Sequence, residues 1–415
     1  GSGLYMYDIK AKKLKNYRYE DKTSGLNSNY VRSLALDQEN RLWVGTYSGL
    51  NIYKEGKDCF SSMESSMTQV GTLSQNSVRC IFRDSQGGMW LGTYWGGLSY
   101  YHSLCNRFQQ IKHIPFYNSL SDNVVSCIVE DKMNNLWIGT SDGGLNFYDN
   151  ITKSYKNYLF NPDTSEGVPF KDIKTVYVDE STDKVYVGAH AGGMMILNRK
   201  TEKKEFYNQQ NSNLPSNNIY SIISDEGEGL WIASLEHFIY FDIAQKCFTV
   251  IDKDVKGRPI QKYNRLLFRD SKRRIWAGGE MGLSVYNQID KSLLTNTDFH
   301  IPTVLEQSFV NCIYESASSY IWIGTCNGLF ALREGDQEPL QYTTDNGLPS
   351  NVIYGILEDS YGRLWVSTNQ GLSCFNPDNR KLRNFTIVDG LQSNQFNARS
   401  YCRISKGNML FGGIN

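Results

Sequence analysis

Seven aromatic, acidic and histidine side chains stand where they could form a ligand-binding surface. Each follows closely on one copy of a recurring aromatic segment, and the residue types differ from copy to copy. Aromatic faces can stack on sugar rings, and polar groups set among them can bind hydroxyls. The predicted ligand-binding residues are Tyr47, Tyr94, Trp95, His190, Glu236, His237 and Glu280.

Asparagines form a second set that we expect on the same face. They end Leu-x-x-Asn segments that lead into predicted strands, and they recur in most copies of the repeat. An asparagine in such a place usually bonds the backbone of a turn, so we interpret this set as structural, with ligand contact as the alternative. The set comprises Asn29, Asn76, Asn123, Asn217, Asn351 and Asn394.

Both sets are positioned by an internal repeat. Its marker is Arg41-Leu42-Trp43-Val44-Gly45-Thr46, and related segments recur at intervals of 43 to 49 residues up to Met409-Leu410-Phe411-Gly412-Gly413. Each of the nine repeats divides into four short runs rich in Val, Ile, Tyr, Phe and Trp, separated by tight-turn residues, and no sustained helical period is present. Four antiparallel strands at this period predict an all-β chain, a β-propeller with almost no helix.

Small residues are expected in the innermost strand of each blade, because side chains crowd the central axis there. Ser33, Cys80, Cys127, Cys312 and Gly355 hold this position, whereas Leu266 departs from the rule. The aromatic residue of each marker is expected to pack between adjacent blades, with the following glycine allowing close approach. These inter-blade residues are Trp43, Trp90, Trp137, Tyr186, Trp231, Trp276, Trp322 and Trp365.

Composition excludes several classes of function. Lys and Arg number 43 and balance 43 Asp and Glu, so no global charge attracts nucleic acid. No run of 18 apolar residues suggests a membrane segment, and no signal peptide is recognised. Gly1-Ser2-Gly3 looks like a cloning scar, so a native leader could have been removed. The nine cysteines contain no C-x-x-C pair, and we interpret Cys80, Cys127 and Cys312 as small buried hydrophobes.

Catalytic motifs are absent from the sequence. None of the five histidines falls in H-E-x-x-H or H-x-H spacing, and no G-x-S-x-G elbow or phosphate loop occurs. We therefore predict no catalytic residue, no metal and no cofactor. A propeller glycosidase or lyase stays open as an alternative, because the sequence gives no distances between acidic side chains and the fold hosts many functions.

The two chain ends complement each other. Residues 4–17 read as the third and fourth strands of a repeat, and residues 400–413 as the first and second. Pairing these half-blades would remove two exposed sheet edges, so our first choice is a single ring of nine repeats over residues 1–415.

The repeat resembles the periplasmic two-component-regulator propeller family. The matching motifs are Ser119-Leu120-Ser121-Asp122-Asn123, Leu136-Trp137-Ile138-Gly139-Thr140 and Asp142-Gly143-Gly144-Leu145. The resemblance implies the periplasmic sensor region of a hybrid two-component system of Bacteroides type. Its histidine kinase and membrane helix would lie outside this chain, and the full-length inner-membrane receptor would be a homodimer.

Relatives in this family carry two seven-bladed propellers, which implies a different division of the chain. Residues 4–112 would then be a remnant of a first propeller and residues 113–415 a second propeller.

The resemblance also implies a non-catalytic role in which an oligosaccharide binds and the signal passes to the kinase. A glycosidase or lyase, or a scaffold for protein partners, are the alternatives.

Overall fold

The computed structural model describes residues 1–19, 25–66, 72–101, 108–161, 167–227, 229–260, 264–294, 301–336 and 338–414. The chain divides into two compact units, which are described separately. The first comprises Gly1–Gln110 and Val388–Gly390, and the second comprises Ile111–Ile387 and Leu391–Asn415.

The first unit contains three antiparallel sheets. A two-stranded sheet, β1–β2, is followed by the four-stranded β3–β6 and the three-stranded β7–β9. A 3-10 turn, Glu55–Lys57, joins β5 to β6. The strands are β1 (Leu4–Asp8), β2 (Lys13–Tyr17), β3 (Val31–Leu36), β4 (Leu42–Thr46), β5 (Gly49–Lys54), β6 (Cys59–Met63), β7 (Val78–Arg83), β8 (Met89–Thr93) and β9 (Leu98–Tyr101).

The second unit contains six four-stranded sheets and one two-stranded sheet, β34–β35. The strands are β10 (Val125–Glu130), β11 (Leu136–Thr140), β12 (Leu145–Asp149), β13 (Ser154–Tyr158), β14 (Ile173–Asp179), β15 (Lys184–Ala189), β16 (Gly193–Asn198), β17 (Lys204–Tyr207), β18 (Ile219–Ser224), β19 (Gly229–Ser234), β20 (Phe238–Asp242), β21 (Cys247–Val250), β22 (Asn264–Arg269), β23 (Arg274–Gly279), β24 (Gly282–Asn287), β25 (Ser292–Leu293), β26 (Val310–Glu315), β27 (Ile321–Thr325), β28 (Gly328–Leu332), β29 (Leu340–Tyr342), β30 (Ile353–Glu358), β31 (Leu364–Thr368), β32 (Gly371–Asn376), β33 (Lys381–Phe385), β34 (Phe396–Arg403) and β35 (Met409–Gly413). Helix in the described residues is confined to α1 (Thr303–Glu306) and short 3-10 turns such as Thr344–Asn346 and Ile387–Asp389.

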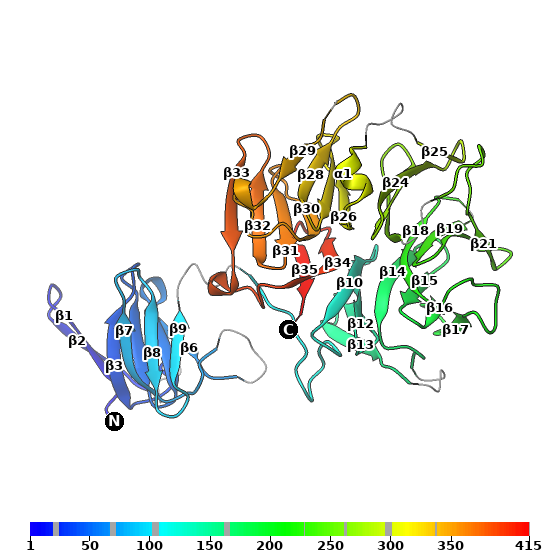
Figure 1. Ribbon diagram of the computed structural model, residues 1–415. Coiled ribbons are helices and arrows are strands. Elements are labelled where there is room, and N and C mark those ends of the chain that lie inside the picture. Colours follow the sequence, from blue (N-terminus) through cyan, green and yellow to red (C-terminus); the bar gives the residue numbers. More distant parts are fainter. Residues whose placement is uncertain are drawn as a thin grey trace. The chain divides into compact units, whose positions relative to one another are not determined.

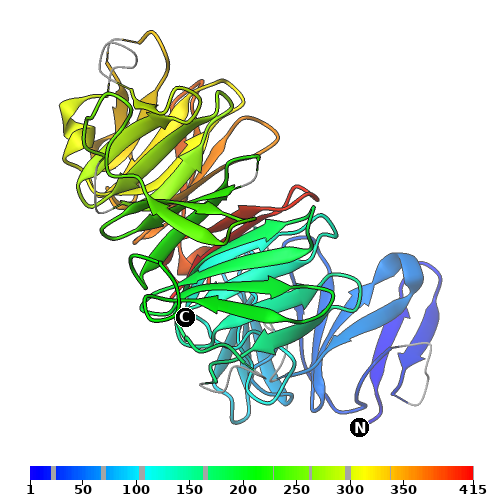
Figure 2. The same cartoon turned by 90° about the vertical axis from the view of Figure 1, so that its right-hand side faces the viewer.

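The sheets of the second unit follow one another around a closed circle. The first strand of each sheet contacts the first strand of the next, and β34 contacts both β30 and β10. In Figures 1 and 2 the red β34–β35 pair lies beside the cyan-green β10, where the end of the unit meets its beginning. The circle therefore closes through β34.

The sheet β34–β35 has two strands, and within the second unit its first strand packs between β30 and β10. In the first unit, β1–β2 is also a two-stranded sheet. The single ring of nine repeats over residues 1–415, and the alternative division into residues 4–112 and 113–415, both stay predictions.

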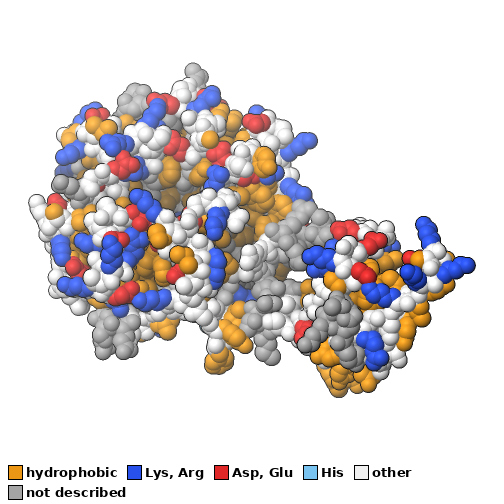
Figure 3. Space-filling view, turned by 180° about the vertical axis from the view of Figure 1, so that it is seen from behind, with side chains coloured by type: hydrophobic (Ala, Val, Ile, Leu, Met, Phe, Trp, Pro, Cys, Tyr) orange, Lys and Arg blue, Asp and Glu red, His pale blue; other side chains and the backbone are white. Residues whose placement is uncertain are grey.

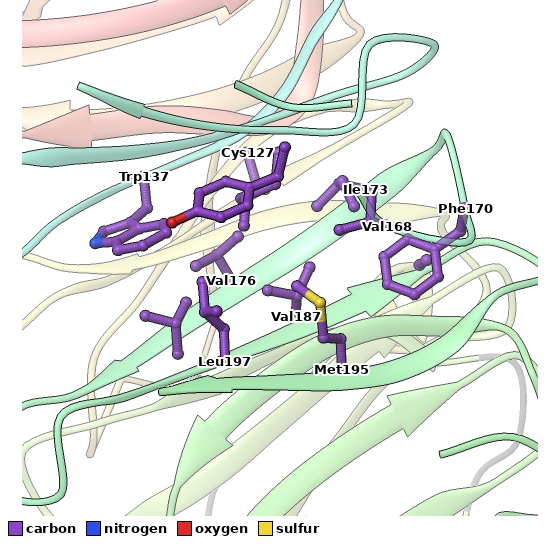
Figure 4. Close-up of a cluster of buried hydrophobic side chains, with 13 residues drawn as sticks. Cys127, Trp137, Val168, Phe170, Ile173, Val176, Val187, Met195 and Leu197 are labelled. Atoms are coloured by element: carbon purple, nitrogen blue, oxygen red, sulfur yellow. The ribbon is translucent and has the colours of Figure 1, made fainter. Parts of the chain in front are cut away.

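The aromatic residues of the marker segments pack between adjacent sheets. Six of the eight predicted inter-blade aromatics are buried, and each belongs to a cluster with strands of the following sheet. Trp137, for example, lies among Val176, Val187 and Leu197 of the next sheet (Figure 4). The buried six are Trp43, Trp137, Tyr186, Trp231, Trp276 and Trp322.

The remaining two aromatics differ for a reason visible in the topology. Trp90 is 38% exposed, since no further sheet follows β7–β9 within the first unit, and inter-blade burial does not hold for it. Trp365 is partly buried, since the sheet that follows it has only two strands. The innermost cysteines divide in the same way: Cys127 and Cys312 are buried, whereas Cys80 is exposed, which corrects the expectation for Cys80.

The marker glycine permits close approach of neighbouring sheets. A Cβ atom at Gly139 would lie 2.6 Å from Ile173 Cγ2 on the next sheet and 2.6 Å from Cys127 Sγ on its own. At Gly324 the same atom would lie 2.6 Å from Ile353 Cγ2. These separations are far shorter than a van der Waals contact, so only glycine fits without moving a sheet.

A turn aspartate ties the marker tryptophan to its own repeat. Asp37 Oδ1 accepts the backbone N–H groups of Glu39 and Arg41, while Oδ2 accepts the Arg41 guanidinium and, at 2.9 Å, the Trp43 indole. This indole bond recurs from Trp90 to Asp84, from Trp276 to Asp270 and from Trp365 to Asp359. Burial opposes ionisation, yet the bonds from Arg41 and Trp43 hold the pKa of Asp37 below its ordinary value.

Asp254 makes the same kind of turn and should make stability depend on pH. Burial alone would raise its pKa, but hydrogen bonds from the Leu293 and Arg258 backbone and from the Arg258 guanidinium lower the pKa to about 2. A lowered folded-state pKa stabilises the protein above the unfolded value near 4, and this contribution is lost as pH falls toward 2. Asp254→Asn should lower the denaturation midpoint at pH 7, by an amount that shrinks between about pH 4 and pH 2. Asp378→Asn, at an exposed aspartate, is the control, and a pH-independent deficit in the Asp254 variant would contradict the assignment.

Candidate functional site

The first strand of nearly every sheet contains a one-residue bulge. In β3, for example, Val31 pairs with Thr46 and Ser33 with Gly45, which leaves Arg32 without a cross-strand partner. Bulges re-aim side chains, and they are frequent next to binding sites. The bulge residues are Arg32, Arg79, Ser126, Lys174, Tyr220, Arg265, Asn311 and Tyr354.

In β34 the irregular stretch is longer and lies between Phe396 and Tyr401, so that it includes Arg399. Sequence reasoning passed over all these residues. The available signal was a position directly before the small inner residue whose type changes from repeat to repeat.

A large open cleft lies in the first unit. Its volume is about 1050 Å³, and it contains Tyr47, Tyr94 and Trp95 of the predicted set. Figure 3 shows hydrophobic side chains gathered along one edge of this smaller unit. The remaining lining residues are Tyr19, Asn27, Ser28, Asn29, Tyr30, Arg32, Ser48, Glu64, Gln75, Asn76, Ser77 and Arg79.

We call this site the aromatic cleft. Its aromatic rings contact one another and the guanidinium groups of two arginines. Tyr94 and Trp95 meet edge to face with ring centroids 4.7 Å apart, and Trp95 is 81% exposed. The Arg79 guanidinium lies 4.9 Å from the Tyr94 ring centre, and that of Arg32 lies 5.0 Å from the Tyr47 ring centre. The cleft thus offers exposed ring faces with cations already stacked beside them.

The loop that carries two of these rings is held by Gln75, which also lines the cleft. Its Oε1 atom accepts the Tyr94 backbone N–H at 3.1 Å. On the other sheet, the Arg32 Nη1 donates to Ser77 Oγ at 2.7 Å. The bond from Gln75 thus holds the loop of Tyr94 and Trp95 by its backbone and not through the rings.

The asparagine set has a backbone role in every repeat where we expected it. Each amide oxygen accepts an N–H from the segment that precedes the inner strand, as in Asn123 with His113 at 2.7 Å and Asn351 with Thr344 at 2.8 Å. The same bond is made by Asn29, Asn76, Asn217 and Asn394. A shared bond of this kind supports the structural interpretation.

In the second unit, two predicted residues meet around Tyr220, a bulge residue that is 5% exposed. His190 Nδ1 lies 3.2 Å from the Tyr220 hydroxyl, and Glu280 forms an ion pair with Arg265. The Arg265 guanidinium lies 5.0 Å from the Tyr220 ring centre, and the Arg399 guanidinium lies 5.6 Å from it. Burial lowers the pKa of the Arg399 guanidinium.

Glu236 and His237 form a separate pair. They sit in the turn between β19 and β20, with Glu236 Oε2 3.9 Å from His237 Nε2. The seven predicted residues are thus distributed over the aromatic cleft, the Tyr220 cluster and this turn.

Among the described residues, no three His, Cys, Asp or Glu side chains are grouped so that they could hold a metal ion. No helix in the described part of the chain has the length and apolar character needed to cross a membrane.

Comparison with known proteins identifies the repeat. Four segments match the family described as "Two component regulator propeller", at residues 25–48, 72–95, 119–142 and 347–370. No curated protein matches the chain. The predicted resemblance to these repeats is therefore confirmed.

Solved structures show the same fold at low sequence identity. The extracellular domain of the putative hybrid two component system BT4673 from B. thetaiotaomicron is 19% identical, with a TM-score of 0.59 over 99% of this chain and 54% of that one. PorZ of Porphyromonas gingivalis is 13% identical, with a TM-score of 0.55 over 99% of this chain and 71% of that one. A virginiamycin B lyase from Staphylococcus aureus is 12% identical, with a TM-score of 0.53 over 70% of this chain and 93% of that one.

These matches confirm the predicted all-β propeller of four-stranded antiparallel blades. The chain spans about half the length of the BT4673 domain.

Proposed function

We propose that this chain, which carries two-component regulator propeller repeats, is a non-catalytic ligand-sensing region of a hybrid two-component system. It would lie in the periplasm as part of a homodimeric inner-membrane receptor and signal to a histidine kinase beyond this chain. The family matches and the likeness to the BT4673 extracellular domain support the sensor role. The ligand we propose is an oligosaccharide, bound in the aromatic cleft.

The composition of the cleft is the observation that carries the ligand assignment. Five aromatic side chains and several amides and hydroxyls line a volume of about 1050 Å³. Ligand sites typically occupy about 300–1000 Å³ and combine aromatic walls with a few polar groups. Exposed rings such as Trp95 and Tyr47 offer faces for sugar rings, and polar side chains such as Gln75 and Asn76 lie among them in the lining.

Trp95→Ala tests this proposal. Because Trp95 is 81% exposed, its loss should leave the melting temperature within about 1 °C of wild type while weakening oligosaccharide binding at least about tenfold. Isothermal titration calorimetry of the full chain against neutral and acidic oligosaccharides would measure the affinity. Tyr361→Ala is the control, since Tyr361 is 80% exposed and outside the cleft. Undiminished binding by the Trp95 variant would remove the cleft from the proposal.

An enzyme is the second candidate, favoured by the Tyr220 cluster. A histidine, a tyrosine hydroxyl and a guanidinium are the groups that acid–base chemistry on an acidic sugar would use. In the structure, however, Arg265 is paired with Glu280 and Tyr220 is buried, so a substrate would have to displace that pairing first. Product analysis by mass spectrometry after each titration would separate the two candidates, since turnover that His190→Ala abolishes would establish the enzyme.

A further inference from the structure

Arg32 and Arg79 occupy equivalent bulges in the two neighbouring sheets that bound the aromatic cleft. They are 47 residues apart in the sequence, both are exposed, and both line the cleft. Each guanidinium lies over a tyrosine ring, at 5.0 Å from the Tyr47 ring centre for Arg32 and 4.9 Å from the Tyr94 ring centre for Arg79. A stacked guanidinium keeps its N–H donors in its own plane, where they can still bind an anion side-on.

Within the described part of the chain, Arg32 and Arg79 have no acidic partner. No described carboxylate forms an ion pair with either of them, and Arg32 donates instead to the neutral hydroxyl of Ser77. Other cations of the same unit behave differently, since Arg41 pairs with Asp37 and Lys15 with Asp58. Among the described residues that line the cleft, Glu64 is the single acid against two arginines.

The second unit provides an internal comparison. Its cationic bulge residues, Lys174 and Arg265, both have carboxylate partners. Lys174 Nζ lies 2.7 Å from Asp172 Oδ1, and Arg265 pairs with Glu280. In the second unit, the cationic bulge residues are therefore paired with carboxylates of the protein. In the first unit no described carboxylate pairs with them, so they can bind an external anion.

We propose that the occupant of the aromatic cleft is an anionic oligosaccharide, whose carboxylate or sulfate groups bind Arg32 and Arg79 while its rings stack on Tyr47, Tyr94 and Trp95. Two arginines at matching places on adjacent sheets suit an anion carried on more than one sugar of a chain. This inference rests on the proposed oligosaccharide-sensing function and specifies its ligand class. A uronate and a sulfated sugar present the same anionic chemistry to a guanidinium, so the experiment must distinguish them.

The test compares size-matched neutral, uronate-containing and sulfated oligosaccharides, titrated into the full chain by calorimetry at 50 mM and 500 mM salt. We expect the wild type to bind one acidic series at least about tenfold more tightly than the neutral one, with this preference reduced at high salt. The double variant Arg32→Gln/Arg79→Gln should lose the preference, so that it binds the acidic and neutral series with similar affinity. Whichever acidic series binds more tightly identifies the anion.

Lys54→Gln/Lys57→Gln is the matched control, because it removes two exposed positive charges from the same unit outside the cleft. It should keep the acidic preference. Equal affinity of wild type for neutral and acidic sugars, or a preference that survives in the arginine variant, would overturn the inference while leaving the sensing proposal in place. Binding that Trp95→Ala leaves unchanged, or no sugar binding at all, would overturn both.

Discussion

Replacing Trp137 with alanine is expected to lower the free energy of unfolding by about 3–5 kcal/mol. The indole is 2% exposed and lies between its own sheet and the next, against Val176 and Val187. Truncation removes the largest apolar contact of that interface and leaves a cavity, because sheets held apart by neighbouring residues can close only partly. Denaturant unfolding followed by far-ultraviolet circular dichroism would measure the loss.

Trp90→Ala provides the matched comparison, since the same motif position is 38% exposed there. Its loss should be about 1 kcal/mol, made up mainly of the hydrogen bond from its indole to Asp84. A loss below about 1 kcal/mol for the Trp137 variant would place that side chain on the surface and contradict the packing described above.

The propeller could be predicted because its determinants are local. A tryptophan, a glycine and a turn of defined type recur in most repeats, and each acts on atoms within the repeat or its immediate neighbour. Gly139 shows this directly: it excludes a Cβ because of Cys127 in its own sheet and Ile173 in the next. Such contacts are repeated along the chain, so that they leave a period in the sequence.

Ring closure could not be predicted in the same way. The half-blades at the two ends look complementary in sequence, and nothing in the sequence showed that β34 would pack between β30 and β10. The number of sheets in a circle depends on small rotations between successive sheets, and no single residue encodes them. Trp90 and Cys80 carry the sequence signature of buried residues yet are exposed, because the motif does not tell whether a following sheet covers them.

The candidate site was only partly accessible from the sequence. Tyr47, Tyr94 and Trp95 follow the marker strand, so their loops could be placed at one end of the sheets, and the structure brings them into one cleft. Arg32 and Arg79 were missed because a strand residue is assigned a face by simple alternation, whereas a bulge breaks the alternation and re-aims the side chain. The register shift appears only when the partner strand is known.

Arg399 should be a second determinant of stability, acting across the second unit. It lies in the irregular part of β34 with φ of 64°, and its Nη1 donates to the backbone carbonyls of Tyr220 at 2.6 Å and Arg265 at 2.5 Å. These acceptors belong to β18 and β22, so one side chain joins the last sheet of the circle to its third and fourth. No described carboxylate pairs with Arg399, and its bonds are therefore its main compensation for burial.

Arg399→Met is expected to cost about 2–4 kcal/mol, because two carbonyls would lose a charged donor in a site with little access to water. Because methionine has no charge to bury, the variant avoids the desolvation cost of the guanidinium, and this offsets part of the loss. It does not replace the missing hydrogen-bond donors. Both residues carry a Cβ at the positive φ, so backbone strain is unchanged in the comparison. Arg399→Lys should lose less, since an ammonium can still reach one carbonyl.

Calorimetric unfolding of Arg399→Met and Arg399→Lys would test this prediction, with Arg383→Met as the control. Arg383 is an exposed arginine of the same unit that packs on Phe385. The expected order of melting temperatures is Arg383→Met close to wild type, then Arg399→Lys, then Arg399→Met. If Arg399→Met had the same melting temperature as Arg383→Met, the two hydrogen bonds to carbonyls would contribute nothing to the stability of the circle. Closure would then rest on the packing of β34 against β30 and β10 alone.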